Sequence, residues 1–394
     1  MSEARCCLSE SDAPKGVAPD GDALVRFKYL NQGGANVIFK ILPWSTAGAE
    51  QPFFFVDCKD DTFLPVHHGD ITSQVLRVDK GLDKTLRCDE VVSGFHDHVR
   101  PLFVPGKISV IAIDSDGLPT VRSVALPDLD FTKHLMKHQG ILLYPNVMVA
   151  LISKAETILP KRKSDANQPT PTNRWGILLP DMSPAVGSSV TIEVKPKWLA
   201  QSPTAPLNAV RCRTCAMQVA KPKDPSNYIC PLRLLDGKSD TFFRWILDRV
   251  KEQLVEHSET LKQQQQEETP ITSAIVEYLT RGDGNALLHH LRLLQTLLDP
   301  QGVHLRSRMY PKPTFDHNLR LAMTVRDCSL YITAQYAAGT GSIKVDSKLG
   351  DLDFKSADKI DDWFSKEEAL LKEAAYTRGI DEDLGCLVAE QLVA

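Results

Sequence analysis

Short runs of apolar and β-branched residues, separated by glycine, proline and aspartate, fill the first half of the chain. Three of them are Asn36–Leu42, Ile108–Ile113 and Val147–Ile152. Runs of this length, bounded by turn residues, are typical of strands. We therefore predict that residues 24–183 are mainly sheet, with a further strand at Trp175–Leu179 after a polar, mobile loop at Lys161–Asn173.

Helical spacing replaces the strand pattern after Asp240. Apolar residues recur at intervals of three and four, and a residue able to cap free N–H groups stands near the start of each segment. This pattern predicts helices at 240–266, 271–281, 285–299 and 356–377. Two β-type segments, Asp327–Tyr336 and Ile343–Phe354, lie near them. The chain is therefore predicted to be an α+β protein, β-rich first and more helical afterwards.

The same patterns suggest how the chain divides. Residues 1–22 are rich in Ser, Asp, Pro and Gly and have no apolar periodicity, so we expect a disordered leader. The β-rich part is predicted to form one lobe over 23–181. The remaining residues, 182–394, are predicted to form a second lobe with a helical insert at about 205–318.

The composition is that of a globular protein, with 42% hydrophobic and 24% charged residues. No run of about 18 apolar residues occurs, and the N-terminal residues lack a signal or transit pattern, so we expect a soluble intracellular protein. The nine cysteines are scattered, which favours reduced thiols over a disulfide framework. Because the formal net charge is −4, any site for a strongly anionic ligand must be local.

One segment, Lys195–Lys238, is strongly basic, with eight lysines and arginines against two aspartates. It overlaps Glu193–Lys197 (EVKPK), where strand alternation places Glu193, Lys195 and Lys197 on one face. Lysine ammonium groups on such a face can donate to phosphates in a polar cleft. Solvated loop charge or an exposed edge strand explains the same residues, so both interpretations stay open.

Asp351–Lys355 (DLDFK) also alternates and leads into a helix. A carboxylate at a strand end, such as Asp351, suits Mg²⁺, which prefers one or two protein carboxylates together with phosphate oxygens. Lys355, Lys359 and Trp363 follow at spacings of four, which predicts one column of side chains able to reach phosphates. An amphipathic helix that buries Trp363 is the alternative.

Two further segments can take part in the same chemistry. Asp327, in Arg326–Ser329 (RDCS), is the first residue of a β-type segment. A carboxylate there could accept a proton from an attacking hydroxyl, although an aspartate at the start of a strand is more often a turn residue. Asn31–Asn36 (NQGGAN) lies between two β-type runs. Its glycine-rich backbone can approach phosphates or simply close a hairpin.

Three cysteines raise the question of a metal. Cys212 and Cys215 form a CxxC pair, and Cys230 follows. Thiolates at this spacing can share a tetrahedral zinc ion, but the sequence near Cys230 offers no fourth ligand. We therefore do not expect structural zinc, and the sequence leaves open whether the three thiols bind a metal.

Taken in chain order, GGAN, EVKPK, AMQVAK (Ala216–Lys221), RDCS and DLDFK resemble the inositol-pentakisphosphate 2-kinase family. The resemblance spans about Tyr29–Trp363, is weakest over 240–318, and suggests a divergent, fungal-type member. It implies a two-lobed kinase-like fold with an inositol-phosphate-binding subdomain in the second lobe. It also implies an ATP-dependent kinase that uses Mg²⁺.

The resemblance implies roles for individual residues. Asp327, the implied base for the inositol 2-hydroxyl, and Lys195 are the catalytic pair, and Asp351 and Asp327 are the implied Mg²⁺ ligands. The residues implied to bind ATP are Gly33, Gly34, Asn36, Arg77, Asp181, Met182, Glu193 and Lys195. Those implied to bind inositol phosphate are Lys197, Lys221, Lys355, Lys359 and Trp363.

Three departures from the family pattern affect this assignment. The family has arginine and tyrosine where this chain has Lys359 and Trp363. A substrate arginine of the family falls near Arg162, where the loop length leaves the alignment ambiguous. The His/Cys zinc site of plant members has no matching set of residues here.

The implied reaction transfers the γ-phosphoryl group of ATP to the axial 2-hydroxyl of inositol pentakisphosphate, giving inositol hexakisphosphate. Alternatives are a kinase for another ring position, a non-catalytic inositol-phosphate-binding scaffold and a zinc-dependent interaction module. The implied partners are ATP and inositol pentakisphosphate, without nucleic acid or membrane insertion. We expect a monomer in the nucleus or cytoplasm, the family favouring the nucleus.

Overall fold

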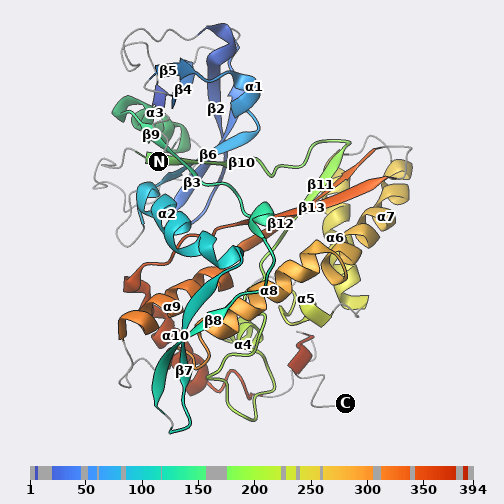
Figure 1. Cartoon of the computed structure of the whole chain (residues 1–394). Coiled ribbons are helices and arrows are strands. Elements are labelled where there is room, and N and C mark those ends of the chain that lie inside the picture. The colour runs from blue at the N-terminus through green and yellow to red at the C-terminus, as the bar shows by residue number, and fades with distance from the viewer. Residues whose placement is uncertain are drawn as a thin grey trace. The chain divides into compact units, whose positions relative to one another are not determined.

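The computed structural model describes residues 5–7, 20–45, 52–59, 62–80, 86–116, 118–156, 175–222, 228–236, 240–257, 261–304, 312–337, 342–378 and 385–388. Contacts divide the chain into two compact units, residues 1–97 with 136–181 and residues 98–135 with 182–394. Both units contain helices and strands, which confirms the predicted α+β class (Figure 1). The predicted first lobe included 98–135, but this segment belongs to the second unit because its strand β7 (Lys107–Ile113) packs against α8 (Asp283–Leu298) and α9 (Lys312–Arg326).

One sheet forms most of the first unit. Its strands are β1 (Arg5–Cys7), β2 (Leu24–Gln32), β3 (Asn36–Pro43), β4 (Phe53–Lys59), β5 (Thr62–Pro65), β6 (Gln74–Asp79), β9 (Gln139–Leu143) and β10 (Trp175–Pro180). Their order is β1-β9-β10-β6-β3-β2-β4-β5, and β1 also pairs with β4. This additional pairing closes the sheet into a barrel from which only β5 is excluded.

The strand β1 lies inside the segment predicted to be a disordered leader, so that prediction is wrong at Arg5–Cys7. Cys6 and Cys7 are fully buried, and their strand pairs with β4 on one side and β9 on the other. A strand of three residues is too short to show a pattern in sequence, and its order comes from pairing with both neighbours. The rest of the predicted leader up to residue 19 lies outside the described residues.

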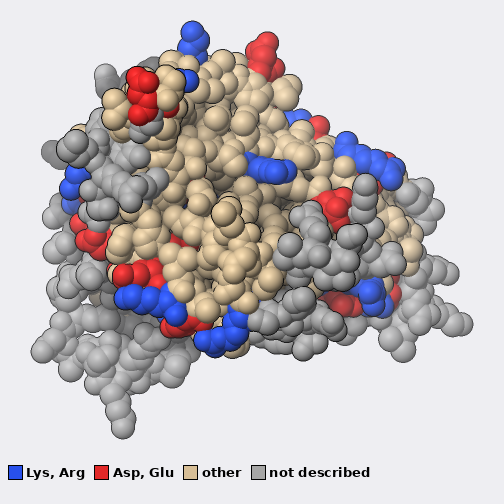
Figure 2. All heavy atoms as spheres, turned by 90° about the horizontal axis from the view of Figure 1, so that it is seen from below, with Lys and Arg blue, Asp and Glu red and all other residues tan. Residues whose placement is uncertain are grey.

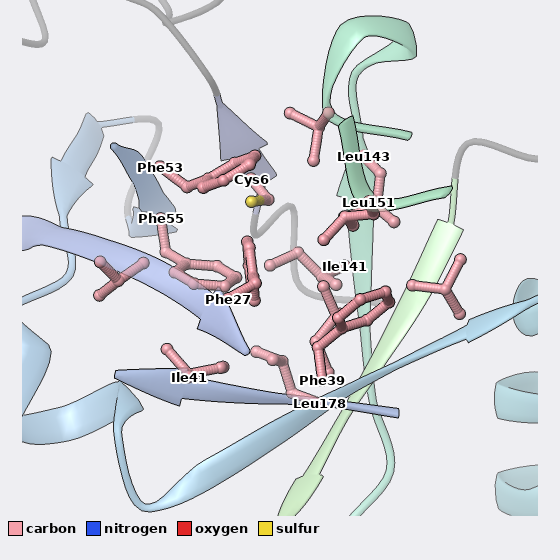
Figure 3. Packing of buried hydrophobic residues seen from close by; sticks show 14 of the residues in the cluster. Cys6, Phe27, Phe39, Ile41, Phe53, Phe55, Ile141, Leu143, Leu151 and Leu178 are labelled. Atoms are coloured by element: carbon pink, nitrogen blue, oxygen red, sulfur yellow. The ribbon is translucent and has the colours of Figure 1, made fainter. Parts of the chain in front are cut away.

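Aromatic side chains fill the interior of the barrel (Figure 3). Phe27 meets Phe39, Phe53 and Phe55 in edge-to-face contacts, with ring centroids 4.8 to 6.3 Å apart. All four are at most 3% exposed. This core belongs to the first unit by itself and gives the barrel its main hydrophobic stabilisation.

The helix α3 (Pro145–Glu156) contradicts the strand predicted at Val147–Ile152. Val147, Met148, Leu151 and Ala155 enter the barrel core at helical spacing. A short apolar run does not distinguish a buried strand from a buried helix, and the proline at the first helical position was the missed signal. Two short helices, α1 (His68–Ile71) and α2 (Cys88–Gly94), also belong to this unit.

A three-stranded antiparallel sheet lies at the centre of the second unit, in the order β11-β12-β13. Its strands are β11 (Ser189–Val194), β12 (Ser329–Tyr336) and β13 (Ile343–Gly350). The remaining elements are the hairpin of β7 with β8 (Pro119–Ala125), and α4 (Arg213–Ala220), α5 (Arg233–Asp236), α6 (Asp240–His257), α7 (Leu261–Thr280), α8, α9 and α10 (Ile360–Lys372). The two predicted β-type segments are present as β12 and β13, but residues 351–354 lie beyond the end of β13, and residues 195–197 of the motif EVKPK lie beyond the end of β11.

The helix boundaries differ from the prediction in the second half of the chain. The single helix predicted over 240–266 is two helices, because α6 ends at His257 and α7 begins at Leu261 and continues through Pro270. The helix α9 was not predicted. The loop predicted at Lys161–Asn173 lies outside the described residues. Among the helices that the structure describes, none is long and apolar enough to cross a membrane.

Basic and acidic side chains are interspersed on the face of the molecule shown in Figure 2. No continuous basic patch covers the described residues visible there.

Candidate active site

Three strand ends bring the motifs EVKPK, RDCS and DLDFK together. The strand β11 carries Glu193 near its end, and Val194 pairs with Leu330 of β12. Ser329, at the start of β12, pairs with Gly350 at the end of β13. Antiparallel pairing therefore brings the three motifs together at one end of this sheet (Figure 1).

Ser329 is the centre of the first polar group at this end of the sheet. Its hydroxyl lies 2.8 Å from Glu193 Oε1 and 2.7 Å from Asp351 Oδ2. Lys195 Nζ donates to the same hydroxyl at 2.6 Å, pairs with Glu193 at 2.8 Å and lies 3.6 Å from Asp351. The side chains of Lys195, Glu193 and Asp351 are 43 to 52% exposed, so a ligand can reach them. The buried hydroxyl of Ser329 contacts all three and keeps them together.

Asp327 is the centre of a second group. Its Oδ1 accepts from Lys197 Nζ and its Oδ2 from Lys355 Nζ, each at 2.9 Å. The side chain of Asp327 is 55% exposed, so this carboxylate faces the solvent with a lysine on each oxygen. A carboxylate in this position can accept a proton, and the lysines beside it can bind anions.

The charges shift the pKa values of these groups in a consistent direction. Burial raises the pKa of Asp327, but the charges of Lys355 and Lys197 outweigh it and lower the pKa to about 2. Burial also raises the pKa of Glu193, while its hydrogen bond and charge interaction with Lys195 bring the net pKa below the ordinary value. Burial lowers the pKa of Lys195, which Glu193 and Asp351 raise above its ordinary value. All three groups are therefore charged at neutral pH.

Two site residues hold backbone angles that L-residues rarely adopt. Lys197 has φ of 48° and Asp351 has φ of 56°. This left-handed region is costly for residues other than glycine, and such residues concentrate at functional sites. These turns break the strand alternation after β11 and β13, so the predicted common strand face of Glu193, Lys195 and Lys197 is wrong for Lys197. The turn nevertheless directs Lys197 to Asp327.

A cavity of about 640 Å³ opens beside both groups. It is lined by eight basic side chains and two acidic ones: Lys195, Lys197, Arg213, Lys221, Arg249, Arg326, Lys355 and Lys366, with Glu193 and Asp327. Four of these cations come from the basic segment 195–238, and the other four come from later in the chain. Lys195, Lys197 and Lys221 therefore line the same cavity, and their roles as ligands stay predictions.

Two of these cations, Arg213 and Arg326, are paired with buried acidic side chains in the wall of the cavity. Arg213 pairs with Glu367 at 2.7 Å and Arg326 with Asp299 at 2.6 Å, and both acids are 1% exposed. Both guanidinium groups also contact the ring of Trp198, at 4.4 and 3.6 Å. Because Trp198 follows Lys197 and Arg326 precedes Asp327, these contacts hold Lys197 and Asp327 next to each other.

The predicted column of Lys355, Lys359 and Trp363 does not form. The helix α10 begins at Ile360, and Lys355 precedes the Ser356 cap, whose hydroxyl accepts from Asp358 N. Lys355 and Trp363 line the cavity, whereas Lys359 is not among its lining residues. Trp363 is 8% exposed and packs with Ile111 and Leu319, so the amphipathic alternative describes most of its surface.

Sequence reasoning missed several cavity residues. Lys366 lies about one turn after Trp363 on α10, and Arg249 lies on α6 with its guanidinium 3.9 Å from the ring of Trp245. Tyr228 also lines the cavity, from the segment between α4 and α5. The spacing of Trp245 and Arg249 by one helical turn was the only available signal.

The nucleotide ligands predicted in the first unit lie around the hairpin of β2 and β3 and on β6. Gly33 N donates to Asn36 O at 2.9 Å, and a side chain at Gly33 or Gly34 would meet no described atom within 4 Å. With its carboxamide oxygen facing Arg77, Asn36 accepts from Arg77 Nη2 at 2.9 Å. Arg77 itself is 4% exposed.

Asp181 and Met182, predicted to bind ATP, fall where the chain passes from the first unit to the second. Asp181 ends the first unit, where its carboxylate pairs with Lys40 at 3.0 Å and its N–H donates to Ser73 O at 2.9 Å. Met182 begins the second unit. Their roles in binding ATP stay predictions.

The cysteines contradict the premise that a fourth metal ligand is missing. Cys386, near the end of the chain, lies with Cys212, Cys215 and Cys230 so that all four sulfur atoms are within 4.8 Å of one another. All four residues are buried. We call this set the four-cysteine cluster. The fourth thiol was missed because it lies far from the others in sequence, and the expectation that no structural zinc site exists is therefore withdrawn.

A cavity crowded with cations, with exposed carboxylates at its edge, is typical of proteins that bind phosphorylated anions together with a hard metal ion. The comparison with known sequences makes this class specific. The chain belongs to the inositol-pentakisphosphate 2-kinase family, whose sequence model matches residues 29–369.

A curated relative shows how divergent the chain is. The inositol-pentakisphosphate 2-kinase of Yarrowia lipolytica is 31% identical over 191 residues. The match covers 48% of this chain and 55% of that protein. The chain therefore spans about half the length of the curated relative it matches.

The position of Ser329 leads to a prediction for Ser329→Ala. Loss of the hydroxyl removes the contact shared by Lys195, Glu193 and Asp351, so we expect about a tenfold lower kcat and a higher Mg²⁺ requirement. Initial rates across a Mg²⁺ titration measure both. The matched control is Ser347→Ala, which changes a buried serine of β13 bonded to Tyr278 and should alter the melting temperature without changing the Mg²⁺ dependence. An unchanged Mg²⁺ titration in Ser329→Ala would contradict the positioning role.

Proposed function

We propose that this chain is an ATP-dependent kinase that phosphorylates the 2-hydroxyl of inositol pentakisphosphate to give inositol hexakisphosphate. The observation that carries the proposal is the cavity, in which a solvent-facing aspartate, Asp327, stands among eight basic side chains. A ligand with five phosphate groups needs such a concentration of cations, and its free hydroxyl needs a proton acceptor. Family membership and the name of the Yarrowia relative support the same substrate.

The acceptor phosphates are proposed to bind Lys197, Lys221 and Lys355, with Lys366 as an additional ligand. Among the described residues, no ion pair engages the side chain of Lys221 or Lys366, so both ammonium groups are available to a ligand. Lys197 and Lys355 are held by Asp327 and would be shared with phosphates when substrate is bound. The roles predicted for Lys359 and Trp363 remain weaker proposals, because Lys359 does not line the cavity.

Magnesium is assigned to Asp351. Its carboxylate is 52% exposed and offers hard oxygen atoms, whereas both oxygens of Asp327 are occupied by lysines. When bound with ATP, Mg²⁺ neutralises charge on the nucleotide phosphates during transfer. Glu193 and Ser329 hold Lys195, so that its ammonium is directed toward the transferred group.

We also propose that the two units are the lobes of a kinase-like fold. The proposal rests on family membership and on the distribution of the predicted ligands. It assigns the nucleotide to Gly33, Gly34, Asn36, Arg77, Asp181 and Met182 together with Glu193 and Lys195. The substrate residues and the base belong to the second unit.

The test is to incubate the full chain with Mg-ATP and a panel of inositol phosphates and to separate the products by charge. We expect inositol hexakisphosphate from inositol pentakisphosphate with a free 2-hydroxyl. Phosphorylation of a different ring position would identify the alternative kinase. Tight binding without any turnover would support the scaffold alternative and contradict the proposal.

A further inference from the structure

The backbone turn at Lys197 lies outside the three-stranded sheet. The strand β11 ends at Val194, and residues 195–200, all described by the structure, belong to no helix or strand. Lys197 lies in this segment with φ of 48°. A residue other than glycine stays in this left-handed region only where surrounding contacts hold it there. Another element of the fold must therefore supply those contacts.

Gln295 of α8 supplies them. Its Nε2 donates to Lys197 O at 2.8 Å, and its Oε1 accepts from Leu199 N at 2.9 Å. One amide thus satisfies backbone groups on both sides of Trp198, as a paired strand would do within a sheet. Gln295 is 1% exposed and is not among the residues that line the cavity. Any contribution that it makes to the site therefore acts through its neighbours and not through contact with a substrate.

The same glutamine is bonded to the segment that carries the candidate base. Its Nε2 also donates to Val325 O at 3.2 Å, and its main-chain oxygen accepts from Arg326 Nη2 at 3.2 Å. These two residues come directly before Asp327, whose carboxylate accepts from Lys197 Nζ at 2.9 Å. Gln295 therefore joins the backbones of the two segments at the point where their side chains meet.

The hydrogen-bonding groups of this amide are all used. The nitrogen has two acceptors for its two hydrogens, and the oxygen has a donor. An aliphatic side chain in this place would leave the backbone groups of Lys197, Leu199 and Val325 without these bonds, and each loss is costly in a buried position. General stabilisation of the fold is one consequence. The bond to the carbonyl of the strained Lys197 adds a second one, which concerns the direction of the lysine side chain.

We propose that Gln295 is a positioning residue for the substrate site: it holds the turn at Lys197 so that the lysine ammonium is presented to a phosphate group of inositol pentakisphosphate. The inference rests on the proposed function, because Lys197 is one of the proposed ligands of that substrate. A lysine whose backbone is already fixed loses less conformational freedom when the phosphate arrives, so binding is tighter. The nucleotide should depend less on Gln295, because its proposed ligands in the same motif, Glu193 and Lys195, are held by Ser329.

A double-mutant cycle on the full chain tests this dependence. It compares wild type, Gln295→Met, Lys197→Met and the double variant by calorimetric Kd for inositol pentakisphosphate and for a non-hydrolysable ATP analogue at fixed Mg²⁺. We expect each single change to raise the Kd for inositol pentakisphosphate by about tenfold. The double variant should bind about as weakly as Lys197→Met alone, because a residue that acts through Lys197 then has nothing left to position. The Kd for the analogue should stay within about twofold in all four proteins.

Gln253→Met is the matched control. Gln253 of α6 makes the same kind of bond to β11: its Oε1 accepts from Thr191 N at 2.8 Å and its Nε2 donates to Thr191 O. It does not line the cavity either. This change should lower the melting temperature and leave both Kd values unchanged. If Gln295→Met does not fold, Gln295→Glu takes its place in the cycle, because the carboxylate keeps the acceptor for Leu199 N and loses the amide donor to Lys197 O.

Several outcomes would overturn the inference. A folded Gln295 variant, or Lys197→Met itself, that binds inositol pentakisphosphate as tightly as wild type would exclude the positioning role. A double variant weakened by about a hundredfold, the product of the single effects, would show that Gln295 acts independently of Lys197. Equal loss of affinity for the ATP analogue would show that it only stabilises the fold. Failure of the proposed function is distinguishable, because wild type itself would then neither bind nor phosphorylate inositol pentakisphosphate.

Discussion

Replacing Asp327 by asparagine is expected to lower kcat by at least about 10²-fold while the fold stays intact. The amide keeps the shape of the side chain but cannot accept the proton of the attacking hydroxyl. The uncharged amide would also no longer neutralise Lys197 and Lys355, so substrate binding should be retained or strengthened. Single-turnover rates at saturating substrate, together with calorimetric Kd, separate the two effects. Turnover like that of wild type in Asp327→Asn would exclude Asp327 as the base.

The low pKa of Asp327 sets the expected pH dependence. Because Lys355 and Lys197 lower this pKa to about 2, the carboxylate stays ionised throughout the neutral range, and its protonation should not reduce activity down to about pH 5. Any stabilisation from its ion pairs is present above the ordinary pKa of 3.8 and is lost as the pH falls toward about 2. Lys355→Met removes one of these charges, so any acidic limb of the pH profile should move to higher pH.

The proposed substrate would change the same balance. Phosphate groups that share Lys197 and Lys355 reduce the positive charge felt by Asp327, which raises its pKa and makes it a stronger proton acceptor. The base would thus be held inactive by its lysines until the polyanion arrives. The pKa read from the pH dependence of kcat should accordingly lie above that read from kcat/KM.

Asp351→Asn is expected to have an effect of similar size through the metal. Removal of the carboxylate charge weakens Mg²⁺ binding, so kcat should fall at least about 10²-fold at ordinary Mg²⁺ concentrations. Part of the loss should be recovered as Mg²⁺ is raised, which a Mg²⁺ titration of initial rates would show. The Kd for inositol pentakisphosphate measured without nucleotide should change little.

A control on the same sheet isolates this role. Asp346→Asn removes a carboxylate from β13 that accepts a hydrogen bond from Ser347 N and does not line the cavity. It should retain the wild-type Mg²⁺ dependence. If Asp351→Asn and Asp346→Asn behaved alike, Asp351 would not be the metal ligand.

The sequence by itself determined the elements whose signals are local. The strands at Asn36–Pro43, Lys107–Ile113 and Trp175–Pro180 match the predicted β-type runs, because a strand's own apolar and β-branched residues and the turn residues around it carry its signal. The motifs EVKPK, RDCS and DLDFK were also identifiable, since each combines charges within five residues. The structure shows the three motifs at one end of the three-stranded sheet, and their catalytic roles stay predictions.

Only the tertiary structure decided which distant residues meet. Closure of the barrel depends on the strand at Arg5–Cys7, which gains its order from pairing with two other strands. Lys366 lines the cavity and Lys359 does not, and α10 begins at Ile360 and not at residue 356, where the sequence pattern placed its start. Cys386 completes the four-cysteine cluster across a long separation in sequence. Packing and metal-ligand geometry act between groups in space, and no local pattern records these contacts.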